Sequence, residues 1–252
     1  MKVNRINVIK DLIEKNGKMS LEQLGERFPN VSSMTIRRDL LALEEAGVLI
    51  RIRGGAMSVQ ELSKKNEEQF TRRTAIQVAE KKQIAEKAVK VIEPGSSIFL
   101  DSGSTTLYFA KELPDLNYFI STNGLLIAQE LVRKKMPTVT LFGGEVSRNN
   151  MATIGQTTFE DLERINIDTA VMAATAFTED GGFCCGLFSE SEIKRRVIER
   201  AKNVVMLLDT SKVGKIMPYT FAKLTDIDVL VTDGNFPAEL REKIEKQGVR
   251  IL

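Results

Sequence analysis

Two adjacent arginines, Arg37 and Arg38, lie near the start of a segment with helical periodicity. Arginine in the first turns of a helix can pair with both acceptors of a guanine edge or hold a phosphate. The opposite side of the same segment carries a regular apolar stripe, formed by Ile36, Leu40 and Leu43. An isolated arginine pair is usually a solvated surface, so the interpretation as a DNA-binding face depends on the elements around it.

The helix that carries the arginines is predicted over 33–46. Ser32 or Ser33 can accept a hydrogen bond from a backbone N–H of the first turn, and Gly47 lies where the helix can end. We expect the positions away from the apolar stripe to face DNA. They are Ser33, Met34, Thr35, Arg37 and Arg38.

Two more helices and a hairpin surround this helix in the sequence. Apolar residues at helical spacing predict a first helix near the N-terminus, and Ser20 can cap a second one. Residues 48–52 alternate apolar and basic side chains before Gly54 and Gly55, which predicts a short hairpin. Its arginines, which we expect on DNA phosphates, are Arg51 and Arg53. The complete order within residues 1–57 is typical of a winged helix-turn-helix domain that binds double-stranded DNA.

The charge of the chain is small and unevenly placed. The formal net charge is +2, from 36 Lys and Arg and 34 Asp and Glu. Residues 1–57 hold 10 basic and 7 acidic side chains, and the rest of the chain holds 26 and 27. Because DNA affinity grows with the number of phosphates that are neutralised, we expect one copy of the first domain to bind weakly. A specific site would then need a homo-dimer or homo-tetramer.

The chain has no histidine and two cysteines among its 252 residues. The lack of histidine excludes histidine bases and histidine metal ligands, and we expect neither a metal nor a cofactor. Cys184 and Cys185 are adjacent, which suits an ordinary disulfide poorly and indicates a reducing compartment. No apolar run reaches the roughly 18 to 20 residues of a membrane span, and the N-terminus resembles no signal segment. We therefore expect a cytoplasmic protein with no membrane partner.

A second, larger domain is predicted over 75–252. Residues 58–74 are rich in charge and poor in core residues, as is typical of a linker, and a helix follows over 75–92. Beyond this helix, short apolar runs alternate with helical stretches, so we expect an α/β domain with a mostly parallel sheet. The predicted strands are 97–100, 118–121, 138–142, 169–173, 204–208 and 228–232. The predicted helices are 105–113, 125–134, 157–165, 190–201 and 238–247.

One predicted strand ends in a hydroxyl-rich loop. This loop consists of Asp101, Ser102, Gly103, Ser104, Thr105 and Thr106. Backbone N–H groups at a helix N-terminus, together with Ser and Thr hydroxyls, can surround an anion, for which phosphate is the obvious candidate. The same pattern also fits an ordinary strand-to-helix turn in which a hydroxyl caps the helix.

The chain resembles the DeoR family of bacterial transcription regulators in the run 31–40, in Leu43-Glu-Glu-Ala-Gly47 and in Arg53-Gly-Gly-Ala56. Members of this family mostly repress operons for sugar or nucleoside catabolism. The resemblance extends over essentially the entire chain. It implies a C-terminal effector domain that resembles ribose-5-phosphate isomerase and binds a phosphorylated sugar at the Asp101 loop.

The resemblance also implies effector contacts outside the Asp101 loop. The residues concerned are Asn123, Gly144, Glu190, Lys194 and Lys212. Each of three segments has a second interpretation: Gly144 fits a simple turn, Glu190 and Lys194 fit an i,i+4 ion pair, and Lys212 fits a salt-bridged turn at a strand end. The Cys184-Cys185 pair replaces the small or hydroxyl residues that the resemblance leads us to expect.

Two functions from different classes fit these features. In the first, the protein is a repressor that releases its operator when a phosphorylated sugar binds, since ligand and DNA then weaken each other reciprocally. In the alternative, a sugar-phosphate isomerase-like enzyme carries an attached DNA-binding module. Isomerisation needs a base, and the isomerases that the domain resembles have an acidic cluster where this chain reads Ala173-Ala-Thr-Ala176. We therefore predict binding without catalysis.

Overall fold

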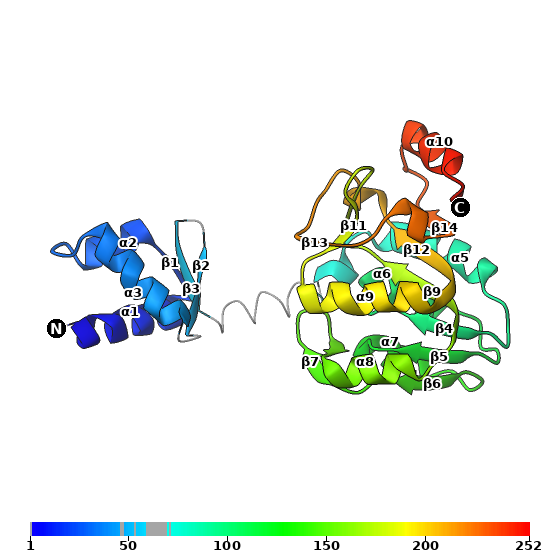
Figure 1. Cartoon of the computed structure of the whole chain (residues 1–252), viewed down its shortest axis with the longest axis horizontal. Helices are drawn as coiled ribbons and strands as arrows, with labels where there is room; N and C mark the ends of the chain where they lie inside the picture. The colour runs from blue at the N-terminus through cyan, green and yellow to red at the C-terminus, as the bar shows by residue number, and fades with distance from the viewer. Residues whose placement is uncertain (1, 46–47, 53, 59–69, 71) are drawn as a thin grey trace. The chain divides into compact units, whose positions relative to one another are not determined.

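The computed structural model of the chain describes residues 2–45, 48–52, 54–58, 70 and 72–252. Two compact units divide the chain, residues 1–69 and 70–252, and each is described by itself (Figure 1). In the described part of the chain, no helix is both long and apolar enough to cross a membrane.

The N-terminal unit contains three helices and a small antiparallel sheet. The helices are α1 (Lys2–Asn16), α2 (Leu21–Arg27) and α3 (Ser33–Glu45). The strands are β1 (Lys18–Ser20), β2 (Leu49–Ile52) and β3 (Gly55–Ser58), in the order β1-β3-β2. This arrangement is the predicted winged helix-turn-helix domain, with β2 and β3 as the wing.

An apolar core and local caps hold the N-terminal unit together. One face of each helix contributes to the core, as Ile9, Leu24 and Ile36 do with exposed fractions of 0%. Ser20 begins α2 with a capping box, in which its hydroxyl accepts from the N–H of Gln23. The predicted helix end at Gly47 and the wing residue Arg53 lie outside the described residues.

The C-terminal unit is built on a seven-stranded parallel sheet. Its order is β15-β14-β12-β9-β4-β5-β6, and every neighbouring pair is parallel. The strands are β4 (Ser97–Leu100), β5 (Phe119–Thr122), β6 (Thr138–Leu141), β9 (Ile167–Ala173), β12 (Ala201–Leu208), β14 (Val229–Thr232) and β15 (Arg250–Ile251). The strand order reverses between β4 and β9, which is where open α/β sheets form their binding crevices.

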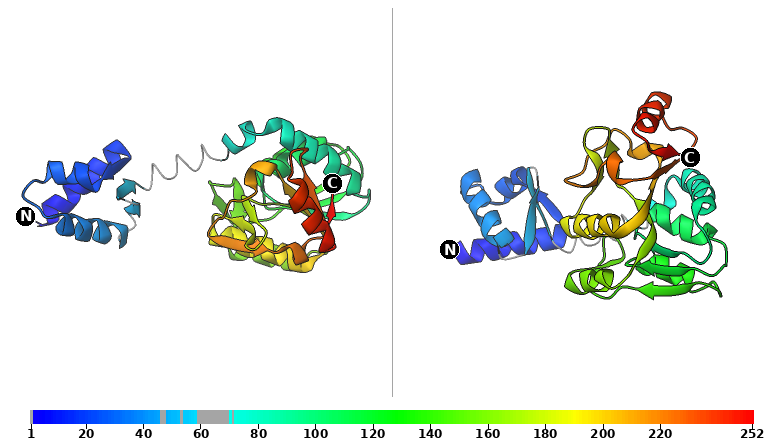
Figure 2. Two further views of the ribbon diagram at one scale, coloured as in Figure 1. Left: turned by 90° about the horizontal axis from the view of Figure 1, so that it is seen from above. Right: turned by 45° about the vertical axis from the view of Figure 1, so that its right-hand side comes forward.

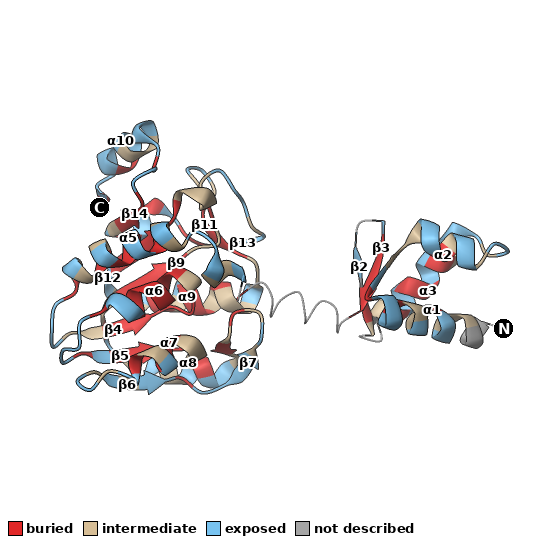
Figure 3. Cartoon of the chain, turned by 180° about the vertical axis from the view of Figure 1, so that it is seen from behind, coloured by how far each residue is buried: buried red, intermediate tan, exposed pale blue. Residues whose placement is uncertain are grey.

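Helices cover both faces of this sheet (Figure 2). One layer contains α5 (Val78–Ala88), α6 (Ser104–Glu112) and α7 (Leu125–Leu131), and the other contains α8 (Gln156–Glu163), α9 (Phe188–Arg200) and α10 (Ala238–Lys246). Successive residues of a strand point to opposite faces, so Ile98 and Leu100 join the first layer and Phe99 joins the second. Both faces of the central strands are therefore buried (Figure 3).

Short strands that were not predicted lie outside the main sheet. A three-stranded antiparallel sheet contains β10 (Ala176–Thr178), β11 (Gly182–Cys185) and β13 (Tyr219–Ala222), and a hairpin contains β7 (Glu145–Ser147) and β8 (Ala152–Ile154). Single 3-10 turns are η1 (Val89–Val91), η2 (Thr210–Lys212) and η3 (Leu224–Asp226). These strands have three or four residues each, too few to show a clear alternation.

The helix predicted over 75–92 is wrong in its extent. Residues 72–75 are helical, the chain then bends at 76–77, and α5 begins at Val78 and is followed by η1. Gln77 has a φ of 51°, in the left-handed region, which a continuous right-handed helix does not contain. Residues 70 and 72–74, predicted as linker, are part of the C-terminal unit. Residues 59–69 and 71 lie outside the described residues.

Candidate functional site

The first turns of α3 present the predicted DNA-binding face. Arg37 and Arg38 are exposed, and Met34 has 60% of its surface exposed. Thr35 is half-buried, and its backbone N and its hydroxyl oxygen lie 3.2 and 2.9 Å from the hydroxyl oxygen of Ser32. Ser32 is therefore the capping serine, and Ser33 lies exposed beside the other predicted contacts.

Two ion pairs hold α3 in its place. Nε of Arg5 on α1 donates to the buried carboxylate of Asp39 at 2.6 Å. The backbone N–H of Arg51 donates to Glu44 at 2.9 Å, and Nε of Arg51 donates to the same carboxylate at 2.5 Å. Arg51 thus ties the wing to α3 while its side chain remains on the surface. The sequence analysis missed Asp39, whose position among apolar residues on the buried side of the helix is the signal for it.

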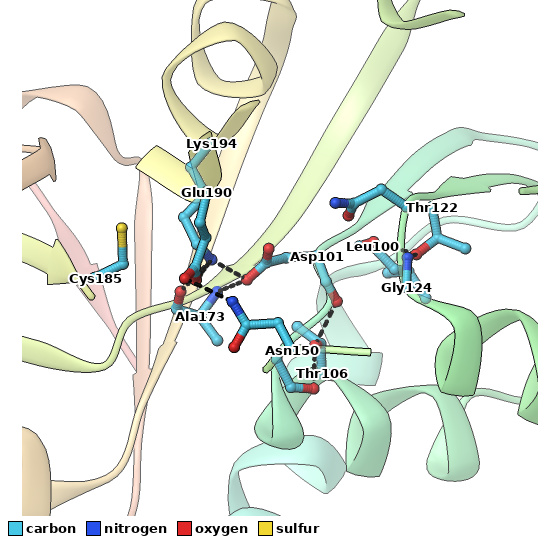
Figure 4. Close-up of polar contacts among 12 residues, drawn as sticks. Leu100, Asp101, Thr106, Thr122, Gly124, Asn150, Ala173, Cys185, Glu190 and Lys194 are labelled. Carbon is cyan, nitrogen blue, oxygen red and sulfur yellow. Dashed lines mark hydrogen bonds and ion pairs between the residues drawn. The ribbon is translucent and has the colours of Figure 1, made fainter. Parts of the chain in front are cut away.

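A buried ion pair stands where the strand order of the large sheet reverses. Asp101 follows β4, and its Oδ2 accepts from the N–H of Ala173, the last residue of β9, at 3.1 Å. Nζ of Lys194, on α9, binds the same Asp101 oxygen and donates to the carbonyl of Ala173 at 2.9 Å. Glu190, one turn earlier on α9, lies 3.4 Å from Nζ of Lys194 (Figure 4). The structure thus brings together three of the predicted effector residues.

In this cluster the positive charge of Lys194 is compensated by the negative charges of Asp101 and Glu190. Burial lowers the pKa of Lys194, but the negative charges of Asp101 and Glu190 outweigh it, so the pKa lies above its ordinary value. Oδ2 of Asp101 is engaged by both the Lys194 ammonium group and the backbone N–H of Ala173. The segment Ala173-Ala-Thr-Ala176 adds no carboxylate to the cluster. The cluster therefore offers paired, pre-oriented charges that suit the binding of a polar ligand.

The loop after Asp101 leads into the N-terminus of α6. The cap position is Gly103, and no side chain caps the helix there. Thr106 is fully buried, and its hydroxyl lies 2.6 Å from the carbonyl oxygen of Asp101 and 2.7 Å from that of Gly103. Thr106 therefore holds the loop in shape, which leaves the first-turn N–H groups of α6 and the hydroxyls of Ser102, Ser104 and Thr105 as candidate anion donors.

Close packing fixes the backbone of this loop. A Cβ on Gly103 would lie 2.9 Å from the Cβ of Ala173, and a Cβ on Gly124 would lie 3.1 Å from the Cα of Ser102. The loops that follow β4, β5 and β9 are therefore in contact at the carboxyl edge of the sheet. Such an edge is where parallel sheets bind ligands.

Asn123, directly after β5, has an unpaired acceptor. Its Nδ2 donates to the carbonyl of Thr153 at 3.0 Å, and the residue has only 4% of its surface exposed. Among the residues that the structure describes, its buried Oδ1 has no hydrogen-bond partner. Since buried polar atoms are nearly always paired, this oxygen calls for a donor such as a hydroxyl group.

Gly144 and Lys212 follow two different strands of the sheet, β6 and β12, and have different roles. Gly144 has a φ of 129°, and a Cβ there would lie 2.4 Å from the carbonyl oxygen of Ile154, so the turn itself requires glycine. Lys212 ends the 3-10 turn η2 after β12, beside the buried Asp209. Burial lowers the pKa of Lys212, and Asp209 partly offsets this effect.

Three polar residues that the sequence analysis missed surround this site. Asn150 donates to Oε2 of Glu190 at 2.8 Å, and Arg73 donates to Oδ1 of Asn150 at 2.8 Å. Nζ of Lys81 donates to the carbonyl of Ile76 at 2.8 Å, and burial lowers the pKa of Lys81 to about 8. The sequence does contain a signal for Lys81. This residue lies on the apolar face of α5, three and four residues before the buried Ile84 and Ala85.

The two cysteines belong to the core. Cys184 and Cys185 are free thiols with exposed fractions of 0%. Burial is the main cause that raises the pKa of Cys185 to about 12, so its thiol is protonated and unreactive near neutral pH. Sγ of Cys184 lies 3.4 Å from the hydroxyl oxygen of Thr220 on β13.

Comparisons with solved structures give partial likenesses. Ribose 5-phosphate isomerase A from Methanocaldococcus jannaschii is 21% identical and has a TM-score of 0.40 over 53% of each chain. The delta subunit of eIF2B from Chaetomium thermophilum is 11% identical and has a TM-score of 0.48 over 64% of this chain and 57% of its own. At these scores, no conclusion about activity follows from either likeness.

Comparisons of sequence cover nearly the whole chain. The family described as DeoR-like helix-turn-helix domain matches residues 5–62, and the family described as DeoR C terminal sensor domain matches residues 76–234. The regulator GlpR of Haloferax volcanii is 32% identical over 97% of this chain and 94% of its own. The regulator GolR of Listeria innocua is 34% identical over 98% and 96%, and the lactose phosphotransferase system repressor of Staphylococcus epidermidis is 32% identical over 97% and 96%.

These relatives are named as regulators of transcription, and both functional units of the chain have a counterpart in the same family. The protein therefore belongs to the DeoR family and is a transcriptional regulator, not an enzyme.

Proposed function

We propose that the protein represses an operon for sugar or nucleoside catabolism and releases its operator when a phosphorylated sugar binds in the C-terminal unit. The observation that carries this proposal is the uncapped N-terminus of α6, which lies at the reversal of strand order beside the buried pair Asp101 and Lys194. An unpaired helix N-terminus favours an anion such as phosphate.

The rest of the site supports a sugar as the body of the ligand. Asn123, after β5, offers a buried acceptor for a hydroxyl group, and Lys212 adds a cation after β12, the strand beside β9. One similar protein is named as a lactose phosphotransferase system repressor, and another as a putative repressor of the aga operon. Both names describe repressors, and the first agrees with control of sugar use.

Operator binding is assigned to α3 and the wing. Exposed Arg37 and Arg38 are suited to base edges and phosphates, and Met34 offers an apolar contact for a thymine methyl group. The small charge excess of residues 1–57 favours a homo-dimer or homo-tetramer that reads two half-sites. As a regulator that acts on DNA, the protein is assigned to the cytoplasm.

A thermal-shift screen of the full chain tests the proposal. Ribose 5-phosphate and fructose 6-phosphate are the probes, with ribose, fructose and inorganic phosphate as controls. A probe at about 100 times its Kd stabilises the native state by about 2.7 kcal/mol, which raises Tm by roughly 5 to 10 °C. If the free sugars raise Tm as much as the phosphorylated ones, recognition of phosphate is refuted.

The Ser104→Asp variant locates the phosphate. A carboxylate in the first turn of α6 interacts favourably with the helix dipole, so the fold is expected to tolerate it, but it repels a bound phosphate. We expect the probe-dependent rise in Tm to disappear, whereas the Ser104→Ala control keeps most of it. If Ser104→Asp keeps the full probe-dependent rise in Tm, the phosphate does not bind at this loop.

A further inference from the structure

A chain of polar contacts connects the effector site to the first residues of the C-terminal unit. Lys194, which binds Asp101, lies 3.4 Å from Glu190, and Glu190 accepts from Nδ2 of Asn150 at 2.8 Å (Figure 4). Oδ1 of Asn150 in turn accepts from Nη2 of Arg73 at 2.8 Å. Arg73 lies only a few residues after the boundary between the two units. The polar chain therefore ends at the segment through which the DNA-binding unit is attached.

The same segment is held a second time by α6. The hydroxyl of Tyr108, one helical turn after Ser104, donates to the carbonyl of Thr74 at 3.0 Å. Lys81 completes the arrangement, since its Nζ donates to the carbonyls of Arg73 and Ile76. Both helices that carry predicted effector residues, α6 and α9, are thus linked to residues 73–76.

Backbone strain occurs near both partners of the contact between Arg73 and Asn150. Gln77, at the end of the held segment, has a φ of 51°, and Met151, directly after Asn150, has a φ of 50°. In the described part of the chain these are the two residues other than glycine with a positive φ. Such conformations cost free energy, persist only where surrounding contacts hold them, and concentrate in segments that switch.

Arg73 itself is incompletely paired. Its Nη2 donates to the carbonyl of Asn149 at 3.1 Å as well as to Asn150, but within the described chain its buried Nε has no hydrogen-bond partner. Burial is the main cause that lowers the pKa of Arg73, and Glu190 and Asp101 partly offset it. The Nε donor of this partly buried cation is available to a different partner, so Arg73 can form another set of contacts.

We infer that the contact of Arg73 with Asn149 and Asn150, which we name the Arg73 clasp, couples the effector site to the DNA-binding unit. This inference rests on the proposed function. An effector hydroxyl that donates to Glu190 competes with Asn150 for this carboxylate, and the clasp opens. Because the two states of the clasp then differ in their effector contacts, binding shifts the population between them. The attached DNA-binding units of an oligomer are no longer held at the spacing of the half-sites.

The coupling is measured on the full-length protein with two probes. The DNA is a duplex selected by the wild-type protein from a random-sequence pool, and the ligand is whichever of ribose 5-phosphate and fructose 6-phosphate raises Tm. Asn150→Ala and Arg73→Gln break the clasp, and Arg133→Gln, at an exposed i,i+3 ion pair of the same unit, is the matched control.

We expect both clasp variants to bind the sugar phosphate at least as tightly as the wild type, because binding no longer has to open the clasp. The ratio of DNA Kd values with and without the ligand should fall from the roughly 5- to 150-fold typical of coupled sites to below about twofold. The Arg133→Gln control should retain the wild-type ratio. A ratio that stays at the wild-type value in both clasp variants overturns the inference, since a merely structural role predicts lower stability with unchanged coupling.

A second arm needs neither DNA nor sugar phosphate. Hydrogen–deuterium exchange of the amides in residues 72–82 is compared between wild type and Glu190→Gln, which removes the negative charge at the centre of the polar chain. We expect exchange there to be faster by about tenfold or more, with no change in Arg133→Gln. Unchanged exchange overturns the inference. Failure of both sugar phosphates to raise Tm refutes the proposed function alone, and this arm still decides whether the clasp responds to the effector site.

Discussion

The two units of the molecule carry their functional side chains in opposite ways. In the N-terminal unit, Arg37 and Arg38 stand exposed on α3 above an apolar core. In the C-terminal unit, Asp101 and Lys194 are almost completely buried and neutralise each other. A long duplex can be reached from the surface, whereas a small anion is bound best by enclosed and pre-oriented groups. We therefore expect binding and stability to be separable at Arg37 in the first unit and inseparable at the Asp101–Lys194 pair in the second.

The largest effect is expected from Lys194→Met in the C-terminal unit. The variant leaves the carboxylates of Asp101 and Glu190 without their buried cation, which should cost about 3–5 kcal/mol of unfolding free energy. Chemical denaturation of the full chain measures this loss. The control is Lys202→Met, which removes an exposed ion pair with Asp168 and should cost at most about 1 kcal/mol. Equal losses in the two variants would contradict the comparison.

A backbone position is expected to dominate the stability of the N-terminal unit. In Gly55→Ala the new Cβ would lie 2.2 Å from the carbonyl oxygen of Met19, where strand β3 meets β1, and the clash should cost about 1–3 kcal/mol. Thermal denaturation of the full chain reports the loss. Gly25→Ala is the control, because it adds a methyl group in open space on α2 and should stabilise by roughly 0.4–1 kcal/mol. If neither variant changes the thermal stability, β1 and β3 leave room for a Cβ at position 55, and the prediction is wrong.

Arg37→Ala should weaken DNA binding without weakening the fold. We expect a loss of about 1–3 kcal/mol in affinity for a selected duplex at fixed salt, since the side chain is exposed on the first turns of α3. The unfolding free energy should change by less than about 0.5 kcal/mol. Fluorescence anisotropy measures the affinity, with Arg164→Ala on the C-terminal unit as the control for a lost positive charge. If Arg37→Ala loses as much unfolding free energy as binding free energy, binding and stability are not separable in the N-terminal unit.

The smallest effect distinguishes two neighbouring serines. Ser32→Ala removes the side-chain acceptor of the Thr35 N–H and should cost about 1 kcal/mol of stability. Ser33→Ala, at an exposed position one residue later, should change stability by less than about 0.5 kcal/mol. Thermal denaturation of the two variants side by side settles which serine begins the helix.

The parts of the fold that local sequence determines are those that the sequence analysis predicted. The periodicity of Ile36, Leu40 and Leu43 follows directly from one buried face of α3, and buried parallel strands such as 97–100 are continuous apolar runs that need no partner to be recognised. The α/β class and the winged helix-turn-helix follow from such patterns alone.

The polar network around the proposed effector site has no local pattern. Asn150 is 77 residues from Arg73 and 40 from Glu190, so its two hydrogen bonds exist only because the topology brings three distant segments together. The bend at Gln77 is equally hidden, because the segments before and after it are helical and no glycine or proline marks it. Propensity is a weak guide where long-range contacts decide.

The ion pair between Asp101 and Lys194 joins residues that are 93 positions apart. During synthesis, the DNA-binding unit can form its contacts once about 60 residues have left the ribosome. Asp101 can pair with Lys194 only after α9 has also been synthesised. We therefore expect a growing chain to present a finished DNA-binding face before it has any means of response. The two units are thus expected to fold in sequence, and the proposed effector site is completed last.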